Sequence, residues 1–277
     1  MLNIVLAAAV ANPASFQCGL FAACFLLLWA IEWRAFRETA SAKSWHSASN
    51  LAFMLSALPI QLTLIAVCLR VAAYVTAHHI GLVYLLPGAD NVWIRLGVMF
   101  LILDFLDYAY HYLAHNIPFL WRFHLVHHSD RSVDVSTTFR EHPGETLIRV
   151  SFLILFVGLS GASVAVLALR QTLETFANLS QHTRFRLPQN MQDIFGRIFV
   201  TPNLHHAHHH FRLPGTNCNY GDVFSIWDRL CGTYRDFGAE KIVFGIDTHM
   251  NASDMEIFCE PLGLGVAERK AASRSAA

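Results

Sequence analysis

The chain has 277 residues, of which 54% are hydrophobic and only 14% are charged. A soluble domain carries roughly 25% charged residues, so the composition excludes an ordinary soluble protein and predicts an integral membrane protein. The 20 basic and 20 acidic side chains balance, which removes the electrostatic argument for a nucleic-acid partner. The six cysteines form no CxxC pair and indicate thiols rather than a disulfide framework.

Three apolar segments approach the length of about 20 residues that a membrane-spanning helix requires, and they cover residues 13–33, 51–77 and 92–113. The segment 78–91 carries no Lys or Arg. Basic residues occur instead in the segments 34–50 and 114–147 and again from Arg184 onwards. The positive-inside rule therefore places these basic segments in the cytoplasm and the segment 78–91 outside.

Residues 146–176 form a fourth apolar segment that is too long for one crossing and too short for two full ones. A single crossing would also put the basic C-terminal third outside. Because Gly158 and Gly161 can break a helix, we predict a hairpin of two short helices, each ~15–20 Å long, that enters the bilayer and returns.

The predicted fold is therefore an all-α integral membrane protein with about three full transmembrane helices, a short helical hairpin and a cytoplasmic helical cap that carries the histidines. The predicted division of the chain is membrane helices over 1–95, a catalytic domain over 96–240 and a tail over 241–277.

Most of the 16 histidines are clustered rather than scattered. Two lie four residues apart at the end of the third apolar segment, a spacing that places them on one face of a helix. An HxxHH box follows, then a lone histidine, and finally TPNLHHAHHHF at 201–211, with five histidines in six positions. The clustered histidines are His111, His115, His124, His127, His128, His182, His205, His206, His208, His209 and His210.

Histidines at the end of an apolar segment predict a metal site, because polar groups next to hydrocarbon are costly and usually functional. The cluster has no cysteine and too many histidines for one tetrahedral zinc, but enough for two metals with open positions. Imidazole accepts iron, zinc, copper or nickel, so the ligand type leaves the metal open. The last block fits HxxHH in two registers, starting at His205 or at His206.

At these motifs the sequence resembles the membrane fatty acid hydroxylase/sterol desaturase superfamily of non-haem di-iron enzymes. The resemblance covers about Asp104 to Tyr234 and includes the segments DYAYHxxxH, WRFHxxHHS, TPxLHxxHH, NYGD, WDRL and GTY. It implies two iron ions and selects the register that begins at His205, because in relatives the ligand directly follows that leucine. The implied metal ligands are His111, His115, His124, His127, His128, His182, His205, His208 and His209.

The sequence departs from the family's pattern at one position. Many relatives carry HxxxH before the last box, whereas this chain has Asn178 four residues before His182. Either one metal has a ligand fewer, or Asn178 contributes through its amide oxygen or a water. Because histidine ligands usually donate their second N–H to an acceptor, we expect further residues to orient them from behind. The candidates for this role are Asp107, His142, Asn178, Asp222 and Asp228.

The resemblance implies hydroxylation or desaturation of a lipid by O2, with no catalytic side chain beyond the metal centre. The residues leave the substrate open among a sterol, a fatty acyl chain, an ether lipid and a carotenoid. No cytochrome b5, flavin or ferredoxin unit is recognisable, so we expect a separate electron donor, such as cytochrome b5 or a ferredoxin with its reductase. The alternatives are a histidine-rich membrane metal transporter and a metal-binding protein.

Overall fold

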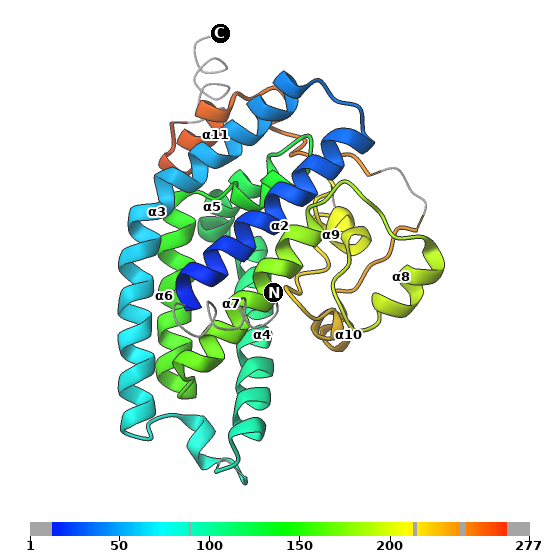
Figure 1. Ribbon diagram of the computed structural model, residues 1–277. Helices are drawn as coiled ribbons and strands as arrows, with labels where there is room; N and C mark the ends of the chain where they lie inside the picture. Colours follow the sequence, from blue (N-terminus) through cyan, green and yellow to red (C-terminus); the bar gives the residue numbers. More distant parts are fainter. Residues whose placement is uncertain (1–12, 89, 213–214, 239–241, 265–277) are drawn as a thin grey trace.

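The computed structural model describes residues 13–88, 90–212, 215–238 and 242–264. Within these ranges the regular structure is helical, and extended pairing is limited to two isolated β-bridges. Figure 1 shows long helices on one side and a group of short helices and loops beside one end of them. The predicted all-α class is confirmed.

Helix α2 (Pro13–Ala35) runs across the front of the bundle, and α3 (Ala40–Ala77) begins at the end of the bundle that carries α5. Figure 1 shows α3 crossing that end and then turning to run down the side of the bundle. The 38-residue helix contains Pro59, which removes a backbone hydrogen bond and so permits a bend. The predicted loop over 34–50 is therefore largely helical, since Thr39 caps α3 by accepting a hydrogen bond from the Ala42 amide.

The predicted hairpin is confirmed as α6 (Pro143–Ser160) and α7 (Val164–Gln181). Each arm has 18 residues and is therefore ~27 Å long, longer than the predicted arms. The tip of the hairpin packs against the segment before η1 (Leu82–Leu85), where a Cβ on Gly81 would lie 2.3 Å from the Gly161 amide nitrogen. Gly161 itself has a φ of +81°, so this close approach requires glycine on both sides.

Three helical stretches are long and apolar enough to cross a membrane: Gln17–Ala35, Ala40–Leu85 and Pro143–Ser160. Helix α4 (Val92–Asn116), which covers the third predicted span, is not among them. Its second half carries Asp104 and Asp107, which are bound to groups of the protein instead of facing lipid. The first arm of the hairpin replaces α4 as a candidate span.

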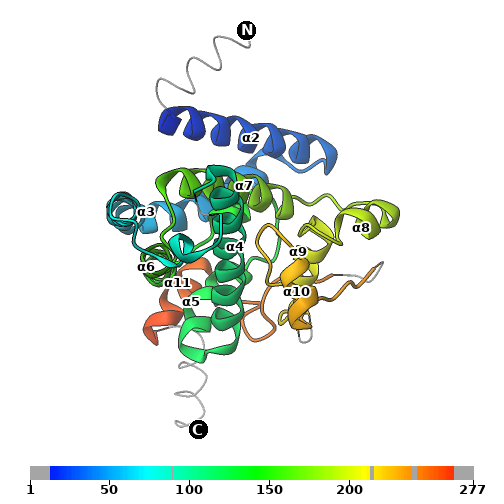
Figure 2. The same cartoon turned by 90° about the horizontal axis from the view of Figure 1, so that it is seen from below.

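The short elements are α5 (Pro118–His128), η2 (Val135–Phe139), α8 (Gln189–Phe195), α9 (Pro202–His208), α10 (Ile226–Cys231), α11 (Asp254–Cys259) and η3 (Glu260–Leu262). Figure 2 shows α8, α9 and α10 together on one side of the bundle, with α2 on its edge. A buried apolar cluster of α3, α4, α6 and α7, with Leu103 and Val157 among its members, fixes the long helices. Ile257 of α11 is also buried, so the part of the predicted tail that is described is packed, and residues 265–277 lie outside the described ranges.

A buried ion-pair network joins α2 and α3 to the loop before η2. The Lys43 ammonium lies 2.6 Å from Glu32 Oε2 and 2.8 Å from Asp134 Oδ2, and both side chains of the first pair are fully buried. His46 contacts Asp134 and Asp130. This network fixes the start of η2. Arg140, directly after η2, has a carbonyl that contacts one of the histidines described next.

Candidate metal centre

Nine buried or half-buried histidines form two groups, and within each group one possible ligand atom per residue lies within 4.8 Å of the others. The five-histidine group contains His111, His115, His124, His128 and His208, and the four-histidine group contains His127, His182, His205 and His209. These nine residues are the same nine that the sequence predicts as ligands. The structure thus brings all of them together, and their role as ligands remains a prediction.

The five-histidine group forms where α4 turns into α5. His111 and His115 lie one turn apart at the end of α4, and Pro118 begins α5 directly afterwards, so α5 folds back on α4. His124 Nε2 then lies 3.1 Å from His111 Nε2, and α9 adds His208 from the other side. Short helices with a tight connection therefore bring five imidazoles to one point.

The four-histidine group joins α5 to the end of α7 and to α9. His182 Nε2 lies 3.1 Å from His127 Nε2 and 2.9 Å from His205 Nε2. His209 Nε2 lies 3.1 Å from His205 Nε2. Two bonds of about 2.1 Å at a right angle place their ligand atoms about 3 Å apart, so these distances match imidazoles around one ion.

Several of these histidines have buried ring nitrogens without any hydrogen-bond partner among the described residues. They are Nε2 of His115 and His208, Nδ1 of His205 and His209, and both ring nitrogens of His128. A buried nitrogen without a partner costs on the order of 1–3 kcal/mol. Nε2 of His115, Nε2 of His208 and a ring nitrogen of His128 fit a site that binds metal, because a metal ion would satisfy nitrogens that the protein leaves free. His205 and His209 differ, since their Nε2 atoms face the group and the free nitrogen is Nδ1.

The protonation state of the histidines also fits metal binding. Burial, followed by the neighbouring imidazoles, lowers the pKa of His127 and the pKa of His182 to about 3. The same causes hold the pKa of His209 well below its usual value. Because metals bind the neutral imidazole, these side chains need not release a proton on binding at neutral pH.

The outer ring nitrogens of five of the nine histidines are held by acceptors, as is usual for metal ligands. Nδ1 of four of them donates to a backbone carbonyl: His111 to Tyr220 at 2.9 Å, His127 to Arg140 at 3.2 Å, His182 to Asn178 at 2.8 Å and His208 to Cys218 at 2.6 Å. His124 Nδ1 instead lies 2.5 Å from Glu145 Oε1. These contacts turn Nε2 of each ring toward its group.

Glu145 is a site residue that the sequence analysis missed. It lies on the first turn of α6, 21 residues from His124, and both side chains are buried. The one available signal was a glutamate three residues after His142 at the start of an apolar helix. Nothing in the spacing showed which histidine it would meet.

Among the residues predicted to orient the ligands, Asn178 and Asp228 act through the backbone. The Asn178 carbonyl accepts from His182, while its side-chain amide donates to Asp222 Oδ1 at 2.9 Å. Asp228 accepts from the amides of Tyr220 and Gly221 at 2.7 and 2.9 Å. Asp228 thereby positions the Tyr220 carbonyl that holds His111, so it supports this histidine indirectly rather than by direct contact.

The other three predicted supports contact no cluster histidine through any described hydrogen bond. Asp107 forms an ion pair of 2.7 Å with Arg170, and Asp222 binds Asn178. His142 caps α6 by accepting from the Gly144 amide at 2.9 Å. Asp107 and Asp222 thus contact partners that are distant in sequence, whereas His142 contacts the start of its own helix.

The remaining two histidines of the block TPNLHHAHHHF point away from both groups. His206 Nε2 donates to the Thr183 carbonyl at 2.8 Å, and His210 Nδ1 accepts from the Val243 amide at 3.2 Å. The structure therefore gathers His205, His208 and His209, the register that begins at His205.

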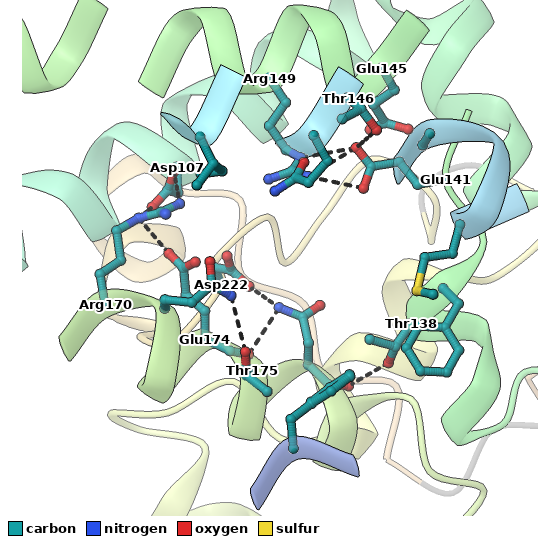
Figure 3. A pocket seen from close by; sticks show the side chains of 18 of the residues that line it. Asp107, Thr138, Glu141, Glu145, Thr146, Arg149, Arg170, Glu174, Thr175 and Asp222 are labelled. Atoms are coloured by element: carbon teal, nitrogen blue, oxygen red, sulfur yellow. Dashed lines mark hydrogen bonds and ion pairs between the residues drawn. The ribbon is translucent and has the colours of Figure 1, made fainter. Parts of the chain in front are cut away.

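A cavity of about 630 Å³ lies against the histidines, and His111, His124, His127 and His205 line it. Helices α2 and α3 contribute mainly apolar side chains, and two of these, Leu20 and Leu62, are also exposed on the outer surface. Both belong to candidate membrane spans, so two such spans contribute to the lining of the cavity. Figure 3 shows the charged side chains that line its inner walls.

Together, the fold and the site define a helical membrane protein with two adjoining histidine groups that could bind metal at the end of a cavity. The fatty acid hydroxylase family model matches residues 96–233, about half of the chain. The chain belongs to this family.

Three relatives give the range of the similarity. The chain is 36% identical to the ornithine lipid hydroxylase of Rhizobium tropici over 49% of this chain and 40% of the relative. It is 29% identical to the human alkylglycerol monooxygenase over 58% and 35% of the two chains. It is 26% identical to the rat cholesterol 25-hydroxylase over 54% and 49%. The matches thus span half or less of these relatives' lengths, and no solved structure matches the chain.

Proposed function

We propose that the protein is a membrane-bound di-iron oxygenase that hydroxylates or desaturates a lipid with O2 and electrons from a separate donor. The observation that carries the proposal is the meeting of two buried histidine groups with a cavity that α2 and α3 line mainly with apolar side chains. The names of the three relatives each specify a lipid, which supports a lipid substrate for this chain. For hydroxylation, R–H, O2, two electrons and two protons give R–OH and water.

In this proposal the five-histidine group holds one iron and the four-histidine group holds the other. Bound iron supplies the chemistry that activates O2 toward an unactivated C–H bond. The protein's own residues fix the imidazoles through carbonyls and Glu145, exclude bulk water and hold the lipid in the cavity. No nucleophilic or general-base side chain is required.

The division of the chain into membrane helices, a catalytic domain over 96–240 and a C-terminal segment remains part of the proposal, as does the position of the metal centre on the cytoplasmic side. The basic residues around α5 and after α7 support this orientation through the positive-inside rule. Cytochrome b5, or a ferredoxin with its reductase, is the class of electron donor that we propose.

The test is to purify the chain in lipid nanodiscs, measure bound metals by mass spectrometry and compare lipid extracts of cells with and without the gene. We expect about two iron ions per chain and lipids that have gained one oxygen or lost two hydrogens. His182→Ala and His205→Ala should each lose one iron ion together with the product, because the four-histidine group has one ligand fewer than its neighbour. His206→Gln is the matched control, because it retains a donor for the Thr183 carbonyl and lies outside both groups.

Full iron in both alanine variants would contradict the ligand assignment. Metal flux into vesicles without any lipid oxidation would favour a metal transporter instead. Bound metal with neither flux nor oxidation would indicate a metal-binding protein.

A further inference from the structure

The cavity is charged where it meets the histidines, and this feature bears on which part of a lipid reaches them. One inner wall carries Asp107, Arg170, Glu174 and Asp222, and the facing wall carries Glu141, Glu145 and Arg149 (Figure 3). Hydrocarbon packed against such groups would remove their water without supplying hydrogen-bond partners, which is unfavourable. A bare alkyl chain or a sterol ring is therefore a poor occupant of this end.

The carboxylates outnumber the cations on both walls. Arg170 Nη2 lies 2.7 Å from Asp107 Oδ1, and the Arg170 Nε also donates to Asp107 Oδ2 at 2.8 Å. Arg149 donates to both oxygens of Glu141 at 3.0 Å. One carboxylate thus matches each guanidinium, and Glu174, Asp222 and Glu145 are in excess.

The excess carboxylates have unused acceptor capacity that faces the cavity. Glu145 Oε2 is buried and has no hydrogen-bond partner within the described part of the chain, although the residue lines the cavity. Asp222 Oδ1 accepts from the Asn178 amide, and Glu174 shares Arg170 with Asp107. The acceptor atoms of Asp107, Glu174 and Asp222 lie within 4.8 Å of one another, close enough for one small donor-rich group to reach two of them.

We infer that the substrate enters head first and that its head carries a primary ammonium group, which Asp222 and Glu174 bind, so that the oxidised carbon lies in or beside the head. An ammonium has three donors and no acceptor, which complements two carboxylates. The hydrogen bonds are charge-assisted and formed away from bulk water. The acyl chains then occupy the part of the cavity that α2 and α3 line with apolar side chains. The inference rests on the proposed function, whose substrate it specifies.

The first test is binding, measured by calorimetry on the iron-loaded protein in nanodiscs without electron donor. The probes share a dodecyl chain and differ in the head: dodecylammonium, dodecanol and dodecanoate. We expect dodecylammonium to bind about tenfold more tightly than dodecanol, and dodecanoate to bind most weakly. Equal or tighter binding of dodecanol or dodecanoate would overturn the inference, because the carboxylates would then serve only the charge of the metals.

Variants assign the preference to the two carboxylates. Asp222→Asn and Glu174→Gln, each nearly isosteric, should reduce the preference for dodecylammonium over dodecanol to about threefold or less. The control is Asp193→Asn, which removes an exposed carboxylate of α8 outside the cavity and should leave the preference unchanged. An unchanged preference in a folded Asp222→Asn or Glu174→Gln protein would overturn the assignment.

The second test is the position of the new oxygen, located by fragmentation of the lipid product. Oxygen in the head or on the first carbons beside it supports head-first binding. Oxygen far along a chain would overturn it while leaving the proposed oxygenase function intact. If no lipid is oxidised at all, the proposed function fails, and the binding measurements alone decide the head-group preference.

Discussion

The two histidine groups share two helices but differ in the number of histidines that they contain. Helices α5 and α9 contribute to both, while α4 completes the five-histidine group and His182 completes the four-histidine group. The first group is held by Glu145 and by the carbonyls of Tyr220 and Cys218. The second depends on the carbonyls of Arg140 and Asn178 and has one ligand fewer. The four-histidine group should therefore tolerate less damage than its neighbour.

The largest expected effect is the loss of a ligand from the smaller group. His182→Ala leaves three histidines there, and we expect iron to fall from about two ions per chain to about one, with product lost entirely. Metal analysis of the purified variant measures this. Retention of both ions in His182→Ala would show that His182 only packs against His127 and His205.

A large effect on folding stability is expected from Lys43→Met. The change leaves Glu32 and Asp134 buried without their cation, and breaking a buried ion pair costs about 3–5 kcal/mol. Because Asp134 begins η2, and Thr138 of η2 lies 3.3 Å from His182 Nδ1, iron should be lost first from the four-histidine group. Chemical unfolding in detergent, with the exposed Arg197→Met as control, measures the cost; equal stability of both variants would contradict it.

An intermediate effect is expected from Glu145→Gln in the five-histidine group. The amide keeps the shape but weakens the acceptor for His124, and loss of such a partner typically lowers metal affinity about 10–100-fold. Competition with a chelator measures the affinity of each ion. If the ion in the four-histidine group weakens instead, the division of the histidines into these two groups is wrong.

The smallest effects on iron content are expected from His115→Ala and Asn178→Ala. His115→Ala still leaves four histidines in its group. Asn178 holds His182 through its backbone carbonyl, which alanine retains. Both variants should keep about two iron ions by metal analysis. Loss of one ion in Asn178→Ala would show that the Asn178 side chain takes the place of the relatives' histidine.

The sequence was sufficient to predict which histidines gather, because their spacing of three and four residues indicates helix faces and the resemblance to the family selects the register that begins at His205. The hairpin was predictable from Gly161 and from the length of the apolar segment. Chain position was insufficient for the partners behind the ligands. Four are backbone carbonyls, which have no sequence signature, and Glu145 meets His124 only because α6 packs against α5.

The same limit explains where the helices differ from the predicted segments. Helix α3 begins at Ala40, within the predicted loop, since the buried Lys43 is matched by Glu32 and Asp134 from elsewhere in the chain. Helix α4 is not among the candidate spans, and its Asp104 and Asp107 have partners on Trp227 and Arg170. A buried charge requires a partner that stabilises it, and here these partners are distant in sequence.

The most direct test of the account is the iron content of the wild-type chain measured beside one variant from each group, His208→Ala and His205→Ala. The account predicts about two ions in the wild type and at least partial retention in His208→Ala, where four histidines remain. It predicts that His205→Ala keeps about one ion, held by the intact five-histidine group. A wild-type content of one ion or none, or complete loss of iron in His205→Ala, would contradict two separate metal positions.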